Sequence, residues 1–131
     1  MKKRGVALLL ALFIMMLASL LVISFVELTT TDLQITDNLY RRDQALYLAD
    51  AGVEYAIYAL QGNKNWKRSN KPIELPGGSG GTYDVTYDNE NGTITSTGLL
   101  SSGQSVTLEA NVSVTGVKSP YKVSIIYWRE L

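Results

Sequence analysis

Residues 6–26 read VALLLALFIMMLASLLVISFV, an uncharged run of 21 residues that only Ser19 and Ser24 interrupt. At 1.5 Å per residue, a helix of this length spans roughly 31 Å, close to the ~30 Å hydrocarbon core of a bilayer. A secretory signal peptide has a shorter apolar region of about 7–15 residues and ends in a small-x-small cleavage site. This run is longer, and it ends in Phe25 and Val26. We therefore expect a retained transmembrane helix over 6–26 rather than a signal peptide.

The charges that flank this run predict its orientation. Basic residues occupy positions 2–4, whereas Glu27 and two aspartates follow the run, with no base before Arg41. The positive-inside rule places such an N-terminus in the cytoplasm. We therefore expect a single-pass protein of the cytoplasmic membrane, with residues 27–131 outside the cytoplasm.

The composition excludes several classes of function. The chain of 131 residues has no cysteine and no histidine, and 12 basic residues balance 12 acidic ones. Disulfides, thiolate metal sites, histidine-dependent catalytic triads and the usual zinc sites are therefore impossible. A neutral chain also gives no general reason to expect nucleic acid as a partner. We expect a non-enzymatic protein without a cofactor or a metal.

Helical periodicity continues beyond the apolar run, over residues 27–61. Apolar residues recur in steps of seven, four and three, at Leu28, Ile35, Leu39, Leu46, Val53, Ile57 and Leu60. Small residues form a second stripe with helical spacing, at Ala45, Ala49, Gly52, Ala56 and Ala59. This pattern predicts an amphipathic helix whose small residues let either a sheet or another helix approach closely.

The composition changes after this helix. Residues 62–81 contain two prolines and many glycines, which is typical of a loop. Residues 82–131 then alternate between apolar and polar side chains. This pattern predicts four antiparallel strands, at 82–88, at 104–115, at 121–128 and one that begins with residues 93–97. In the last strand the alternation puts Val123, Ile125 and Tyr127 on one face. One apolar face needs a cover, so we expect an α+β fold in which the long helix packs on a small sheet of about four strands.

Several short motifs suggest chemistry but favour simpler interpretations. The acidic stretch 88–92 has part of a calcium-loop composition, but it lacks the regular ligand series and predicts a hairpin turn. Asn91 and Asn111 begin glycosylation sequons, of which Asn111 lies in a predicted strand. Asp50 and Glu54 lie four apart on the helix, where a solvated face is a simpler interpretation than a catalytic pair.

The order of these segments resembles that of type IV pilins and pseudopilins. The resemblance lies in the basic leader 1–5 ending in Gly5, the apolar helix, the amphipathic helix and the small sheet. Residues 38–54, NLYRRDQALYLADAGVE, are similar to the asparagine, arginine-rich and alanine–acid–alanine–glycine stretch of PilX-type minor pilins and of K-type pseudopilins of type II secretion. This resemblance covers about residues 1–60.

The resemblance implies how the chain is processed and assembled. A prepilin peptidase would cut after Gly5 and leave Val6 as the N-terminus. Most pilins have glutamate at the fifth mature position, whereas this chain has Leu10 there. Since K-type members also lack this acid, the resemblance implies a minor, initiating or tip-proximal subunit whose partners are other pilins, the assembly machinery and membrane lipid.

Two further functions remain open at this point. One is a single-pass anchored binding module that never polymerises. The other is an accessory DNA-uptake pilin, for which Lys64, Lys67, Arg68 and Lys71 are the candidate basic cluster. A solvated loop is the simpler interpretation of this cluster, so we expect no nucleic-acid partner.

Overall fold

The computed structural model describes residues 2–69, 71–75 and 80–131, with helical side chains described from Gly5 onward. Its elements are α1 (Lys2–Gly62), β1 (Ile73–Glu74), β2 (Gly81–Asp88), β3 (Thr93–Leu100), β4 (Ser105–Thr115) and β5 (Lys122–Glu130). The chain divides into two compact units, one up to Leu39 and the other comprising Tyr40–Leu131. The first unit consists of α1 residues alone, and the second contains the rest of α1 and the whole sheet.

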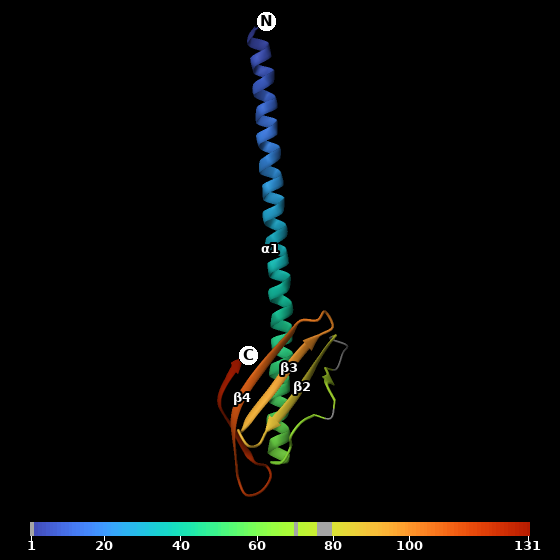
Figure 1. Ribbon diagram of the computed structural model, residues 1–131, viewed down its shortest axis with the longest axis vertical. Coiled ribbons are helices and arrows are strands. Elements are labelled where there is room, and N and C mark those ends of the chain that lie inside the picture. Colours follow the sequence, from blue (N-terminus) through green and yellow to red (C-terminus); the bar gives the residue numbers. More distant parts are fainter. Residues whose placement is uncertain (1, 70, 76–79) are drawn as a thin grey trace. The chain divides into compact units, whose positions relative to one another are not determined.

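The five strands form an antiparallel meander in the order β1-β2-β3-β4-β5 (Figure 1). Each strand pairs with its neighbour in sequence, so short turns are sufficient to connect them. Gly92, with a φ of 65°, lies in the turn between β2 and β3, and Gly103, with a φ of 93°, lies between β3 and β4. These backbone conformations disfavour residues that carry a Cβ atom, which explains glycine at both turns.

The core of the second unit lies between α1 and one face of the sheet. Alternate strand residues point toward the helix, and the fully buried side chains include Leu60, Val85, Ile94 and Ser96. The buried residues of α1 are Ala45, Leu48, Ala49, Gly52, Val53, Ala56 and Leu60. The predicted α+β fold, a long N-terminal helix packed on a small antiparallel sheet, is therefore confirmed.

The sheet has one strand more than the sequence suggested. The segment 62–81, expected to be loop, contains β1, in which Ile73 pairs with Tyr83 of β2. Arg68 makes a further isolated bridge to Thr86. Two-residue strands carry no alternation that a sequence could show, so their position depends on the free edge of β2.

The prediction for the last strand is wrong at Tyr127. The pairing of β4 with β5 contains a bulge between Asn111 and Val112, where Ile126 is the extra residue. Beyond the bulge, Tyr127 lies opposite the solvent-facing Asn111, and Trp128 lies opposite the buried Ala110. An extra residue inverts the alternation of every residue that follows it, which strict period-two reasoning cannot anticipate.

Candidate membrane and assembly segments

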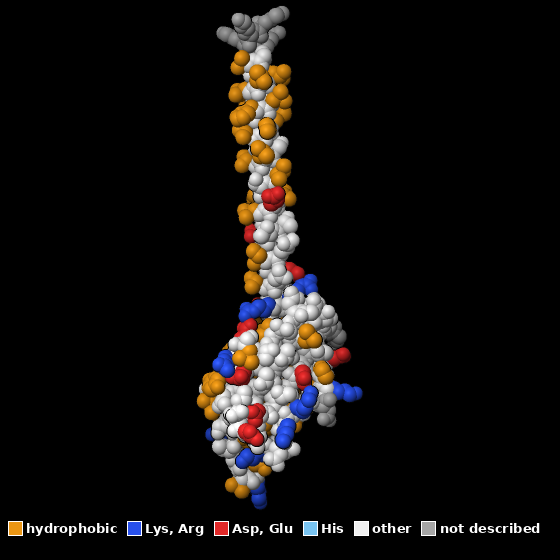
Figure 2. All heavy atoms as spheres, viewed as in Figure 1, with side chains coloured by type: hydrophobic (Ala, Val, Ile, Leu, Met, Phe, Trp, Pro, Cys, Tyr) orange, Lys and Arg blue, Asp and Glu red, His pale blue; other side chains and the backbone are white. Residues whose placement is uncertain are grey.

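The apolar run 6–26 lies in the first unit and is exposed around the whole helix. Exposed fractions range from 46% at Leu17 to 72% at Leu21 among its large hydrophobic side chains. By length and composition α1 is the one helix among the described residues that could cross a membrane. Figure 2 shows hydrophobic side chains along this stretch. A surface of this kind is unfavourable in water and requires either lipid or other apolar helices around it.

The hydroxyl groups of this unit bond to the helix itself. Ser19 donates to the Met15 carbonyl at 2.8 Å, and Ser24 donates to the Leu20 carbonyl at 3.0 Å. Each of the three threonines at 29–31 also donates to the carbonyl four residues earlier. Hydroxyls bonded in this way need no water, so they are compatible with a nonpolar environment. The β-branched threonines leave α1 continuous.

The residues that the resemblance assigns to processing lie at the start of α1. Gly5 and Val6 are exposed, and a Cβ atom added at Gly5 would contact nothing within 4 Å. Leu10 lies one helical turn further along and is 60% exposed. The side chains of residues 2–4, which carry the basic charge of the leader, lie outside those that the structure describes.

The stripe of small residues lies in the second unit. Ala45, Ala49 and Ala56 are fully buried, Gly52 is buried, and Ala59 is half-buried. Ala49 and Ala56 share a hydrophobic cluster with Val85, Ile94 and Leu108 of the strands, and Ala45 shares a second cluster with Leu100 and Val106. The buried stripe residues therefore belong to the arc of α1 that faces the sheet. This arc is therefore occupied within the chain.

Two glycines allow the helix and the sheet to approach closely. A Cβ atom at Gly98 of β3 would lie 2.6 Å from the Ala49 nitrogen and even closer to the Ala45 carbonyl oxygen. A Cβ atom at Gly52 would overlap the hydroxyl of Ser96. This hydroxyl is buried and has no hydrogen-bond partner among the described residues. The close approach fixes which face of α1 packs inward.

The turn between β2 and β3 uses its carboxylate as an internal acceptor. Asp88 accepts hydrogen bonds from the Asn91 side-chain amide at 2.6 Å and from the Glu90 amide at 2.9 Å. These bonds, first that from the Asn91 side chain and then that from the Glu90 backbone, lower the pKa of Asp88. The described residues contain no group of three potential metal-ligating side chains. The stretch 88–92 forms a hydrogen-bonded turn.

The basic residues after α1 are exposed. Arg68 lies 3.9 Å from Asp84 and makes the bridge to β2, and Lys64, Lys67 and Lys71 are exposed. An ion pair so exposed contributes little to stability. All four basic side chains are therefore solvated.

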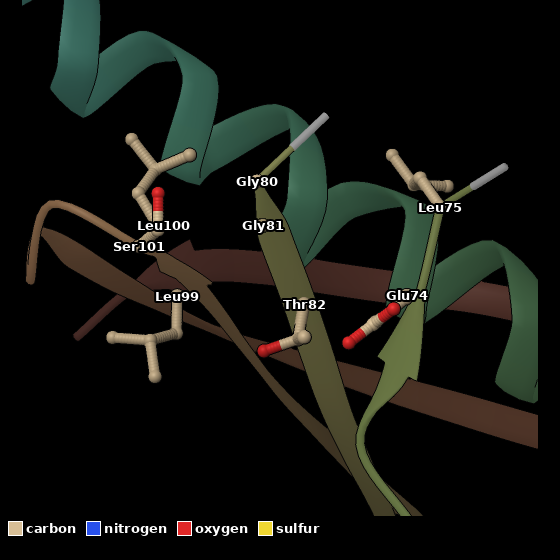
Figure 3. Close-up of a pocket in the computed structure, with 8 residues that line it drawn as sticks. All are labelled: Glu74, Leu75, Gly80, Gly81, Thr82, Leu99, Leu100 and Ser101. Atoms are coloured by element: carbon tan, nitrogen blue, oxygen red, sulfur yellow. The ribbon is translucent and has the colours of Figure 1, made fainter. Parts of the chain in front are cut away.

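A hollow of about 340 Å³ opens between the start of β2 and the end of β3. Figure 3 shows that Leu75 and Leu100 flank it and that Glu74 is the one labelled side chain with a charge. Its lining includes Leu75 and Gly80, and the segment between these two residues in the sequence, 76–79, is outside the described part of the chain. We therefore assign no ligand to it.

A long N-terminal helix that is apolar at its start and packed on an antiparallel sheet at its end defines the pilin-like class of α+β proteins. Residues 4–54 match the sequence model of the family described as PilX N-terminal. The N-terminal part of the chain is therefore similar to that of PilX-type minor pilins. The long apolar N-terminal helix, together with this similarity, supports a membrane-anchored, single-pass protein. Comparisons with curated proteins and with solved structures gave no significant match.

Proposed function

We propose that this protein is a minor subunit of a type IV pilus or a type II secretion filament, stored in the cytoplasmic membrane and contributing to filament assembly, initiation or the tip. The observation that supports this proposal most strongly is the apolar surface of residues 6–26, exposed around the whole helix. Lipid satisfies this surface in the membrane, and neighbouring helices satisfy it in a filament. Because both surroundings are apolar, transfer between them costs little free energy.

The proposed orientation has the N-terminus in the cytoplasm. Basic residues 2–4 precede the apolar run, and Glu27 and Asp32 follow it. A reporter fused after Leu131 should therefore be active in the exported compartment. Prepilin peptidase would then meet its substrate at the cytoplasmic end and cut between Gly5 and Val6. Both residues are free of tertiary contacts that would hinder access.

The test is co-expression of the full chain with a prepilin peptidase, a major pilin and the assembly machinery. We expect mass spectrometry of sheared filaments to detect this protein with Val6 at its N-terminus. A Gly5→Leu variant, which replaces the residue before the cut, should retain its leader and stay in the membrane fraction. A Gly62→Ala variant is the matched control, because nothing lies within 4 Å of either glycine's added Cβ atom.

The result also separates this function from that of a plain membrane anchor. An anchored binding module would retain Met1 and would be missing from filaments even with the complete machinery. That outcome would overturn the proposal.

A further inference from the structure

The strand β5 forms one edge of the sheet. It pairs with β4 on one side, and no strand of the described residues pairs with its other side. With nine residues it is much longer than the two-residue β1 at the opposite edge. Its free backbone groups are therefore available to an additional strand.

This edge strand is unusually apolar for an exposed position. Ile125, Ile126, Tyr127 and Trp128 are 47%, 64%, 49% and 63% exposed. Because Ile126 is the bulged residue, Ile125 and Trp128 both lie opposite buried residues of β4 and so face the helix side of the sheet. Proteins usually protect an edge strand with charges, prolines, bulges or a covering element. β5 has a bulge at Ile126, but its charges lie only at its ends and its central residues 125–128 are apolar. An uncovered apolar edge indicates a surface that another chain covers.

A groove lies on the helix side of this edge. It is lined by Asp50, Val53 and Glu54 of α1, Leu108 of β4, and Ile125 and Trp128 of β5, and its volume is about 250 Å³. We call these six residues the β5 groove. Its volume is below the roughly 300–1,000 Å³ of small-molecule pockets, so it fits a side chain of a bound polypeptide better than a whole ligand.

The charge of the β5 groove is negative. Asp50 and Glu54 lie one helical turn apart, and neither has an ion-pair partner among the described residues. The two arginines near the end of β5 already have partners in the chain. Arg42 of α1 pairs with Glu130, and Arg129 of β5 pairs with Glu109. The groove therefore joins two carboxylates to an indole ring, a combination that favours a lysine or arginine side chain.

We propose that β5 and its groove bind an extended, cationic strand from a different polypeptide, which extends the sheet and places a lysine or arginine side chain between Asp50, Glu54 and Trp128. The inference rests on the proposed function, in which this polypeptide is a neighbouring filament subunit of another sequence. Backbone hydrogen bonds along β5 supply the docking, and the acidic groove supplies the specificity.

A second copy of this chain fits the surface less well. The opposite edge of its sheet offers only β1, which is two residues long and includes Glu74. Antiparallel pairing of two β5 strands would keep both helices on one side of the seam and bring the acidic pairs of both copies to that side. Like charges there oppose association, so the partner must supply the positive charge.

The first test measures binding directly, on the full chain in a nonionic detergent. The protein has two tryptophans, so a Trp66→Phe variant makes Trp128 the only indole fluorophore. The probe is a synthetic peptide of alternating lysine and valine, and the comparison peptide has glutamate in place of lysine. We expect a saturable blue shift of Trp128 emission with the lysine peptide and none with the glutamate peptide.

Matched variants assign the binding to the groove. In the same background, Asp50→Asn with Glu54→Gln should weaken lysine-peptide binding by roughly tenfold or more. Glu90→Gln removes a carboxylate from the β2–β3 turn, which does not line the groove, and should leave the affinity unchanged. If no shift occurs, if both peptides bind equally, or if the acidic variants bind as well as the parent, the proposal is wrong.

The second test identifies the partner in cells. Because the chain has no cysteine, a single Ser124→Cys substitution on exposed β5 provides a unique cross-linking position. We expect a cross-link to a different filament subunit, whereas a cross-linked pair of identical chains would overturn the choice of partner. Peptide binding without incorporation into filaments would refute the proposed function and leave the cationic-strand site standing. Incorporation without peptide binding would refute the site alone.

Discussion

At the scale of single residues, the close approach of α1 to the sheet limits the size of the side chains that fit between them. Gly98 lies against the backbone of α1, where the nearest atoms of Ala45 and Ala49 belong to the main chain and cannot rotate away. Gly52 faces a side-chain hydroxyl instead, at Ser96. Both positions are glycines in the sequence. The loss of stability caused by an added methyl group depends on whether it meets main-chain atoms or a side chain that can move.

The first prediction concerns Gly98. A Gly98→Ala substitution should destabilise the second unit by more than about 2 kcal/mol, because the sheet and α1 must separate to admit the methyl group. Thermal unfolding of the full chain in detergent, followed by tryptophan fluorescence, measures the change. Gly62→Ala is the control, since its added Cβ atom meets nothing within 4 Å. Equal melting temperatures for the two variants would contradict the observed packing.

The second prediction concerns the pH dependence of the β2–β3 turn. The hydrogen bond from the Asn91 side chain and the backbone bond from Glu90 lower the pKa of Asp88 in the folded state. Because the pKa is lowered on folding, ionised Asp88 stabilises the fold at pH values above the pKa of an unfolded aspartate, about 3.9. This stabilisation is lost as the pH falls through the folded-state pKa. NMR titration of the Asp88 carboxyl carbon should give a midpoint below the ordinary aspartate value. Asn91→Ala should raise that midpoint, and an unchanged midpoint would show that the Asn91 bond has no effect.

At the scale of elements, α1 serves two environments in one continuous helix. Its residues 6–26 are apolar on every side, whereas from Ala45 to Leu60 only the arc that faces the sheet is buried. The sheet ends in β5, whose last residues are attached to α1 by the ion pair between Arg42 and Glu130 at 2.5 Å. Both side chains are substantially exposed, so this contact positions the strand more than it stabilises the fold.

The third prediction tests that attachment. Arg42→Ala should lower the free energy of unfolding by less than about 1 kcal/mol, because solvent screens the pair. Amide hydrogen exchange should nevertheless increase at Arg129 and Glu130, where β5 loses its contact with the helix. Lys118→Ala, a charge change in the exposed loop before β5, should leave these amides unchanged. A large global loss of stability would mean that the pair contributes more than an exposed contact can.

At the scale of the whole molecule, the proposed filament role makes residue 10 the position expected to decide assembly. In most pilins the acid at the fifth mature position offsets the N-terminal amine of a neighbour, and this chain has Leu10 there. An unpaired amine is costly inside an apolar filament core. With the proposed cut after Gly5, the protein would receive an acid from another subunit for its own amine and would supply none.

The fourth prediction follows from this asymmetry. Expressed alone with the assembly machinery, the protein should form no long filaments in electron micrographs of sheared material. Leu10→Glu should increase its incorporation along filaments of a major pilin, as measured by immunoblot of the sheared fraction. Leu10→Ile keeps the position apolar and is the control. Long filaments of this protein alone would exclude the minor-subunit role and leave the PilX-type assignment intact.

The membrane helix, its amphipathic continuation and the antiparallel fold could be predicted from the sequence, because each of them rests on a local periodicity. The 21-residue apolar run and the alternation of Val106, Leu108 and Ala110 can be recognised in the local sequence, without knowledge of the segments that they contact. The N-terminal resemblance was equally local, since the matched family covers residues 4–54. The match of Leu10 to the acidic position of pilins followed from counting residues after Gly5.

The strand β1, the bulge at Ile126 and the β5 groove could not be predicted in this way, because they depend on tertiary contacts. β1 is too short for any periodicity, and it exists because the edge of β2 accepts it. The bulge exchanges the faces of Tyr127 and Trp128 through their pairing with Asn111 and Ala110 of β4, an earlier segment of the chain. Asp50 and Glu54 were a solvated pair in the sequence and became the wall of a groove when β5 packed beside them. Each of these features depends on contacts between distant segments, and such contacts leave no pattern in the local sequence.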